Sequence, residues 1–242
     1  MATEPIAGTV HRVAGCELVV GPDAWAFAHA NRAAIDAHWQ LRQATNPGYF
    51  NGIIHVLASG AIEQGVFKGT FIRTDFKSFL YWRETGYPAA GVRDAFGSAL
   101  VRSREGHVLL GRQSEGHINA GLAYLPGGFI DARDADPASR IDIAASIARE
   151  LAEETGLGAH DLAPEDGYLI IRVGPLVSMV RELRSGLPAQ DLRRQILSRL
   201  AADPGAELAD IVIIRTLADT AGARVPDYTA LALAAVLGTG PA

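Results

Sequence analysis

The sequence predicts an α+β protein. Apolar runs typical of strands and segments with helical spacing follow one another in mixed order, without the strict alternation of a parallel α/β fold. Gly- and Pro-containing turns separate these segments. The chain has 242 residues, of which 48% are hydrophobic and 20% charged. This is enough for one large domain or two small ones with a substantial core.

Residues 1–92 are expected to form a small α+β N-terminal domain that selects the substrate or mediates dimerisation. Gly21-Pro22-Asp23 separates the first strand from the first helix, with Asp23 as the N-cap. Ser59-Gly60 is the expected hairpin turn, and Thr74 is the expected cap of the second helix. The predicted strands are 16–20, 53–57 and 61–67, and the predicted helices are 24–44 and 75–84.

Residues 93–242 form the second predicted domain. A hairpin turn is expected near Glu105-Gly106, and residues 129–140 form an Asp-rich loop. The predicted strands are 96–102, 107–112, 122–125, 168–173, 176–180 and 209–215, and the predicted helices are 142–155, 188–201 and 226–237.

The helix predicted at 142–155 has clear boundaries. Asp142 is a suitable N-cap, and Gly156 fits the left-handed position after the last turn, followed by the apolar Leu157. The side chains at helical spacing predict which face packs on a sheet. The predicted apolar stripe consists of Ala144, Ala148, Leu151 and Thr155, flanked by Ile143 and Ile147.

The same helix carries three acidic residues on one face. Glu150, Glu153 and Glu154 lie at positions i, i+3 and i+4, where like charges destabilise a helix. A divalent cation would neutralise them, and Mg²⁺ prefers carboxylate oxygens and shares its coordination shell with phosphate. The upstream Gly127-Gly128 turn lets the backbone approach a metal or a phosphate closely. The segment therefore predicts a metal site for phosphate chemistry.

Composition narrows the classes of protein to which the chain can belong. The net charge of −5 argues against bulk nucleic-acid binding, although it is compatible with a small anion held by a metal. The single cysteine permits no intrachain disulfide, and no apolar run reaches membrane-spanning length. The N-terminus lacks the features of a signal peptide. We expect a cytoplasmic protein without membrane contact.

The acidic segment resembles the Nudix box, G-x5-E-x7-R-E-U-x-E-E-x-G-U, where U is aliphatic. The half from Arg149 to Leu157 matches at every fixed position. In the other half, Gly128 is followed after five residues by Asp134, where the family has Glu. Fourteen residues instead of seven separate Asp134 from Arg149, which corresponds to a seven-residue insertion. Asp142 is an alternative candidate for the role of the first acid.

The resemblance implies the Nudix fold, a mixed sheet sandwiched between helices. It implies hydrolysis of a nucleoside diphosphate linked to another group. It also implies that Glu150, Glu153 and Glu154 hold Mg²⁺ or Mn²⁺, with the backbone carbonyl of Gly128 as a further ligand. The i, i+4 spacing lets Arg149 pair with Glu153 and orient it. We assign the glutamates mainly as ligands, with one of them able to act as base.

Residues outside the box complete the expected site. Members of the family often use one more acid, and Glu207 is the first candidate and Glu182 the second. Arg112, with Gly127 and Gly128, is a candidate for binding the substrate.

Several alternatives stay open at this stage. The nucleotide derivative is not specified, although Phe50-Asn51-Gly52 looks similar to plant and animal members that cleave UDP-sugars. The aromatic 46–52 run is either a turn or a contact with substrate or a partner chain. The sequence is also compatible with a homodimer. The alternative function is a catalytically idle Nudix-fold module that binds a nucleotide or regulates another protein.

Overall fold

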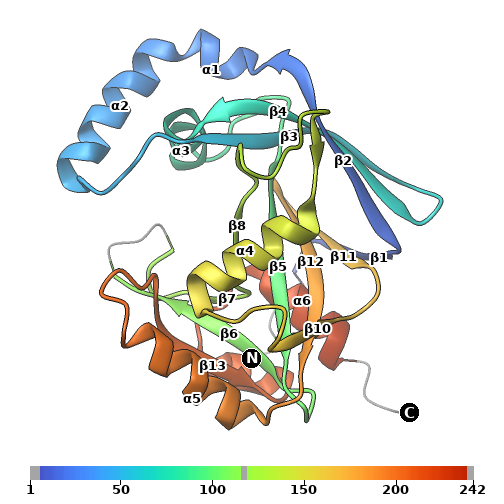
Figure 1. Ribbon diagram of the computed structural model, residues 1–242. Coiled ribbons are helices and arrows are strands. Elements are labelled where there is room, and N and C mark those ends of the chain that lie inside the picture. The colour runs from blue at the N-terminus through green and yellow to red at the C-terminus, as the bar shows by residue number, and fades with distance from the viewer. Residues whose placement is uncertain (1–5, 116–118, 239–242) are drawn as a thin grey trace.

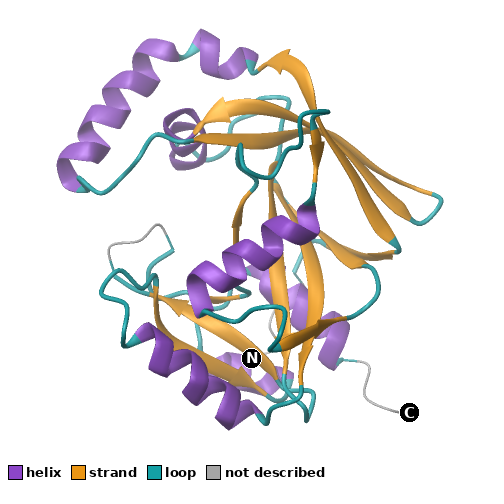
Figure 2. Ribbon diagram, in the orientation of Figure 1, coloured by secondary structure: helices purple, strands orange, loops and turns teal. Residues whose placement is uncertain are grey.

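The computed structural model describes residues 6–115 and 119–238 and confirms the α+β class. Its strands form a nine-stranded sheet and a four-stranded sheet, with helices packed around both (Figure 2). Within these residues, no helix combines the length and the apolar character needed to cross a membrane.

The element bounds are as follows. The larger sheet contains β1 (Thr9–Val13), β5 (Asp94–Arg102), β6 (Val108–Gln113), β7 (Ala123–Tyr124), β8 (Gly127–Phe129), β10 (Leu162–Pro164), β11 (Tyr168–Val173), β12 (Leu176–Ser185) and β13 (Leu208–Ile214). The smaller sheet contains β2 (Gly15–Ala24), β3 (Ile53–Glu63), β4 (Val66–Asp75) and β9 (Arg140–Ile141). The helices are α1 (Ala26–Ala30), α2 (Arg32–Thr45), α3 (Phe76–Glu84), α4 (Ile143–Thr155), α5 (Ala189–Leu200), α6 (Asp227–Leu237) and the 3₁₀ helix η1 (Leu217–Gly222).

Helices cover both faces of the larger sheet (Figure 1). The central path is β1-β11-β12-β5-β6-β13, with β5 and β12 parallel. Along β5, Ala95 and Ala99 belong to the core cluster that contains the apolar residues of α4. Leu100 belongs to the cluster that contains Leu233 of α6. Because successive strand residues point to opposite faces, α4 and α6 sandwich the sheet.

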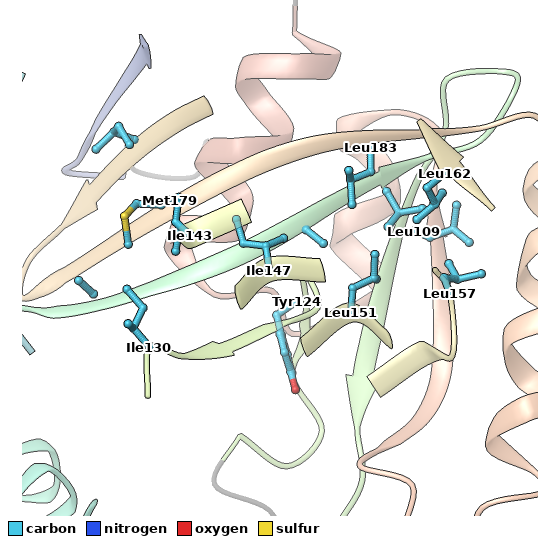
Figure 3. Packing of buried hydrophobic residues seen from close by; sticks show 14 of the residues in the cluster. Leu109, Tyr124, Ile130, Ile143, Ile147, Leu151, Leu157, Leu162, Met179 and Leu183 are labelled. Atoms are coloured by element: carbon cyan, nitrogen blue, oxygen red, sulfur yellow. The ribbon is translucent and has the colours of Figure 1, made fainter. Parts of the chain in front are cut away.

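The acidic helix has the predicted boundaries but a shifted apolar face. Asp142 Oδ1 accepts a hydrogen bond from Ala145 N at 3.0 Å, and Gly156 has φ 69°. The predicted stripe is partly wrong, because Ala148 is exposed. Leu151 of that stripe and the flanking Ile143 and Ile147 are buried as predicted and form the row that packs on the sheet (Figure 3). Burying three large side chains removes more apolar area from water than burying alanines would.

Leu151→Ala is expected to destabilise the protein by about 2–4 kcal/mol, because it leaves a cavity where a 2%-exposed leucine packs. Urea unfolding of both proteins measures the change. Ala148→Ser, on the exposed face of the same helix, is the control and should change the unfolding free energy by less than about 0.5 kcal/mol. Equal effects of the two substitutions would contradict the packing.

The smaller sheet carries helices α1, α2 and α3, but the two sheets share segments. β1, from the start of the chain, pairs with β11 of the larger sheet. β9, which lies in the inserted part of the box loop, pairs with β2 through Leu18↔Ile141 and Val19↔Arg140. The division of the chain at residues 92 and 93 stays a prediction.

Turn positions in the N-terminal region differ from those predicted. The hairpin between β3 and β4 turns at Gln64 and Gly65, with φ of 49° and 77°, not at Ser59-Gly60. Gly60 lies inside β3, where a Cβ atom would come within 2.9 Å of the Phe67 ring. The glycine there permits close packing rather than a reversal.

Helix starts in this region also differ. Strand β2 continues through Gly21-Pro22-Asp23, so Asp23 is not a helix cap. The predicted long helix is divided at Asn31 into α1 and α2. Asp75, rather than Thr74, caps α3, because its carboxylate accepts a hydrogen bond from Ser78 N at 3.1 Å.

Candidate functional site

A cleft of about 790 Å³ opens where two central strands diverge. β5 and β6 pair only through Val101↔Leu109 and Arg102↔Val108. Beyond that point β8 adds to β5 and β7 adds to β6, so the space between them stays open. Residues of the N-terminal region and of the larger sheet both line it. Its size is that of a small-molecule site.

The three predicted glutamates all line this cleft. Glu154 is 6% exposed, and its Oε2 accepts a hydrogen bond from Gly127 N at 3.3 Å. The Tyr124 hydroxyl donates to Glu154 Oε1 at 3.4 Å, and Figure 3 shows that hydroxyl turned away from the apolar cluster. The Glu153 side chain is 52% exposed. The helix therefore presents two enclosed carboxylates and one open to solvent.

The enclosed carboxylates are electrostatically unfavourable as anions. Burial raises the pKa of Glu150 to about 7, despite the neighbouring Arg149. Burial, together with the negative charges of Glu207 and Glu150, raises the pKa of Glu154 well above its usual value. A bound cation would lower the pKa values of both carboxylates.

Gly127 and Gly128, which were predicted as a turn, instead begin strand β8, and each position needs glycine for a different reason. A Cβ atom on Gly127 would lie 2.1 Å from the carbonyl oxygen of Gly97 and 2.9 Å from Ser98 Cα, both backbone atoms of β5. A Cβ atom on Gly128 would lie 2.1 Å from Glu150 Oε2. The first glycine allows β8 to approach β5, and the second leaves room for a carboxylate of the site.

Gly127→Ala and Gly128→Ala should therefore separate stability from function. Gly127→Ala forces two strands apart and should cost about 2–3 kcal/mol, measured by urea unfolding. Gly128→Ala meets the end of a flexible side chain, so the unfolding free energy should fall by less than about 1 kcal/mol. It should still lower turnover, because Glu150 is displaced. The opposite ranking in stability would contradict the geometry.

Arg149 is held by the first acid of the box. Its Nη2 lies 2.9 Å from Asp134 Oδ1 and 3.0 Å from Oδ2. Asp134 is 7% exposed and also accepts a hydrogen bond from Asp131 N at 2.8 Å. Arg149 Nη1 contacts the Glu150 carboxylate, while Glu153 lies farther away at 3.5 Å. Arg149 thus orients Glu150 more directly than the predicted Glu153.

The structure chooses between the two candidates for that first acid. Asp134 binds Arg149, whereas Asp142 is the exposed N-cap of α4. The residues between them leave the box loop and form β9. The insertion therefore lies after the acid and leaves its contact with Arg149 intact.

Asp131 and Arg133 belong to the site, although the sequence predicted only a loop there. Arg133 Nη1 lies 3.2 Å from Glu153 Oε1, and its Nη2 lies 2.6 Å from Asp131 Oδ2. Both residues line the cleft. In the described segments, no three His, Cys, Asp or Glu side chains are arranged to hold a metal ion. Arginines contact Glu150 and Glu153 instead.

The predictions outside the box have different outcomes. Glu207 lines the cleft. Glu182 instead pairs with Arg102 at 2.9 Å. Arg112 is not among the lining residues, whereas the adjacent Gln113 is. Because neighbouring strand residues face opposite ways, Gln113 takes the position predicted for Arg112. Among the residues that the structure describes, Arg83 and Arg133 are the arginines that line the cleft.

Aromatic side chains of the N-terminal region form one wall. Tyr49, Phe50 and Phe76 line the cleft. Tyr49 stacks on Trp39 with ring centroids 6.3 Å apart, and Phe76 contacts Phe129 of β8 at 5.9 Å. Phe50 is 82% exposed. The 46–52 run is thus a loop that reaches the cleft.

A sheet sandwiched between helices, with an acidic helix against a Gly-Gly strand, is the arrangement that the sequence resemblance implied. Residues 91–173 match the family model described as NUDIX domain. The chain therefore contains a NUDIX domain. Comparison with curated proteins gave no match.

Three solved structures illustrate what the chain is similar to. A Nudix hydrolase from M. smegmatis, RenU, is 19% identical with a TM-score of 0.41, covering 62% of this chain and 89% of its own. DR0079 from Deinococcus radiodurans is 16% identical with a TM-score of 0.43, covering 62% and 86%. The NUDIX domain of Shewanella oneidensis NrtR, crystallised with ADP ribose, is 18% identical with a TM-score of 0.38, covering 62% and 91%.

Proposed function

We propose that this protein is a divalent-metal-dependent hydrolase of a nucleoside diphosphate linked to another group. The products would be a nucleoside monophosphate and a phosphorylated second product. The observation that carries the proposal is the set of acidic residues Glu150, Glu153, Glu154 and Glu207 on one cleft, in a chain with a NUDIX domain. A nucleotide sugar is one candidate substrate.

The donor chemistry of the cleft suits Mg²⁺ or Mn²⁺. Glu150 and Glu154 are enclosed carboxylates whose pKa values are raised by burial, and the Glu207 charge raises that of Glu154 further. Hard oxygen ligands of this kind suit both ions. We propose Glu150, Glu153, Glu154 and the Gly128 carbonyl as ligands, once Arg133 and Arg149 release Glu153. When bound, the ion would neutralise phosphate charge and make a water molecule more acidic.

The protein's own groups would position the reaction. Asp134 fixes Arg149, and Arg149 fixes Glu150. The Gly127 N–H and the Tyr124 hydroxyl hold Glu154 in one orientation. Glu207 comes from a separate segment and is our candidate for the extra acid, acting as ligand or as base. Phosphoryl transfer depends mainly on this kind of positioning and charge stabilisation.

Phe50 and its neighbours would receive the nucleoside. An exposed ring beside the cleft offers a stacking surface for a base, and such contacts contribute about 1–3 kcal/mol in nucleic-acid complexes. In this way the N-terminal region would select the substrate. A homodimer, a cytoplasmic location and the absence of bulk nucleic-acid binding stay predictions.

The test is a panel of nucleotide derivatives, assayed with Mg²⁺ and with Mn²⁺ by separating the products chromatographically. The panel comprises nucleotide sugars, ADP-ribose, dinucleoside polyphosphates, oxidised nucleotides and coenzyme A. We expect metal-dependent release of a nucleoside monophosphate from at least one of them. Tight nucleotide binding without turnover of any compound would favour the idle module instead.

A further inference from the structure

The cleft has a second polar end, away from the glutamates. Asp94, Phe96 and Ser98 alternate along β5, and all three line the cleft. Ser98 pairs with Gly127 of β8. At the rise of a β-strand, Asp94 lies about 13 Å farther along β5. A group attached to a diphosphate beside Gly127 can therefore extend toward Asp94.

Asp94 is a buried carboxylate held in a fixed position. It is 6% exposed, and the Tyr87 hydroxyl donates a hydrogen bond to its Oδ2 at 2.9 Å. Tyr87 has φ 55°, its N–H donates to Trp82 O at 3.0 Å, and its ring meets Trp82 edge-on at 4.7 Å. These contacts fix the tyrosine, so Asp94 is a preorganised acceptor at the wall of the cleft.

Arg83 supplies donors at the same end. It comes from α3, and its Nη2 donates to Asn119 Oδ1 at 2.7 Å across the cleft. Its positive charge acts on Asp94, although within the described residues the two groups form no ion pair. A guanidinium has five N–H donors, so Arg83 can donate to a ligand as well.

The charges at this end distinguish between ligand chemistries. A further phosphate or carboxylate would be attracted by Arg83 but repelled by Asp94, and an ammonium group would meet the reverse, so a charged group gains from only one of the two residues. A neutral hydroxyl can donate to Asp94 and accept from Arg83 at once. The buried Asp94 and the half-buried Arg83 are both used by a ligand group that can donate and accept hydrogen bonds.

We propose that Asp94, Arg83 and Tyr87 form a subsite for a neutral polyhydroxylated group, of the sugar type, attached to the distal phosphate of the substrate. This inference rests on the proposed function and names the substrate class. It also gives α3 and the segment after it a role in selecting that group.

The test compares two substrates that differ only in the attached group. These are the nucleoside diphosphate glucose and the methyl ester of the same nucleoside diphosphate, each with adenine and with uracil as base. The wild-type protein should prefer the glucose compound in kcat/KM. Asp94→Asn should reduce that preference about 10- to 100-fold, because a charged acceptor is lost. Tyr87→Phe should reduce it less, and Glu63→Gln, an exposed acid in the β3–β4 hairpin, should not change it.

Other outcomes are distinct. Hydrolysis of both compounds without preference, or a preference that survives Asp94→Asn, overturns the subsite and leaves the proposed function standing. If neither compound is hydrolysed, the proposed function fails for these substrates. The subsite is then tested by measuring the binding of the glucose compound by calorimetry. Equal affinity of wild-type and Asp94→Asn proteins for the glucose compound then overturns it. Thermal unfolding confirms that each variant is folded.

Discussion

Glu154→Gln is expected to lower turnover by about 100-fold or more and to raise the melting temperature of the metal-free protein at pH about 8. Mutation of a residue that merely hydrogen-bonds to a metal ligand typically lowers activity by about 10- to 100-fold. Glu154 is proposed as a ligand itself, so its loss should cost at least as much. The gain in stability follows because burial raises the pKa of Glu154, so its ionised form is unfavourable in the fold. Glutamine keeps an acceptor for Gly127 N and barely changes helix propensity.

Two further variants complete this experiment. Glu153→Gln should also lower turnover by orders of magnitude, but its side chain is half exposed, so stability should hardly change. Glu165→Gln is the control, since that acid pairs with Arg184 and does not line the cleft. Near-wild-type turnover of Glu154→Gln would refute the ligand assignment, and a lower melting temperature would contradict the electrostatic argument.

The metal-free protein should lose stability as the pH rises from about 4.5 to about 7. In the fold, the pKa of Glu150 is raised from 4.5 to about 7. In this window the folded state therefore binds more protons than the unfolded state, and the free energy of unfolding falls with pH. The contribution is fully present below about 4.5 and lost above about 7, and it amounts to at most about 3 kcal/mol.

Mg²⁺ or Mn²⁺ should reverse this trend. A metal competes with protons for the carboxylates, so its binding stabilises the fold more at pH about 8 than at pH about 5. Urea unfolding at several pH values, with each metal and with a chelator, measures both effects. Glu150→Gln should make the metal-free profile less steep, while the raised pKa of Glu154 leaves part of the slope in place. A metal-induced gain of the same size at both ends of the pH range would argue against these carboxylates as the site.

Sequence reasoning worked best where the signals are local. Asp142 and Gly156 determine where α4 begins and ends, because each acts on backbone groups within a few residues. The spacing of the glutamates likewise placed three acids on one cleft, since the helix geometry is fixed. Only the rotation of the helix was misjudged, because the predicted stripe counted alanines as strongly as isoleucines.

Features that depend on distant partners could not be predicted. Whether Arg112 or Gln113 faces the cleft depends on the register of β6 against its neighbours, and a one-residue offset exchanges them. The prediction of a turn at Ser59-Gly60 was wrong because Gly60 instead makes room for the Phe67 ring from the next strand. Arg83 and Asp94 are eleven residues apart and meet in the cleft only through the packing of the two sheets.

β1, from the N-terminal region, lies in the larger sheet, and β9, from the box loop, lies in the smaller one. This arrangement has a practical consequence for dividing the chain into fragments. A fragment beginning near residue 93 would strip β11 of its partner β1 and leave β9 without β2. Unpaired strand edges recruit other chains, so such a fragment should self-associate rather than behave as an autonomous unit. A shortened chain meant to isolate the NUDIX domain would do better to retain residues 9–24, for example through a linker or by circular permutation.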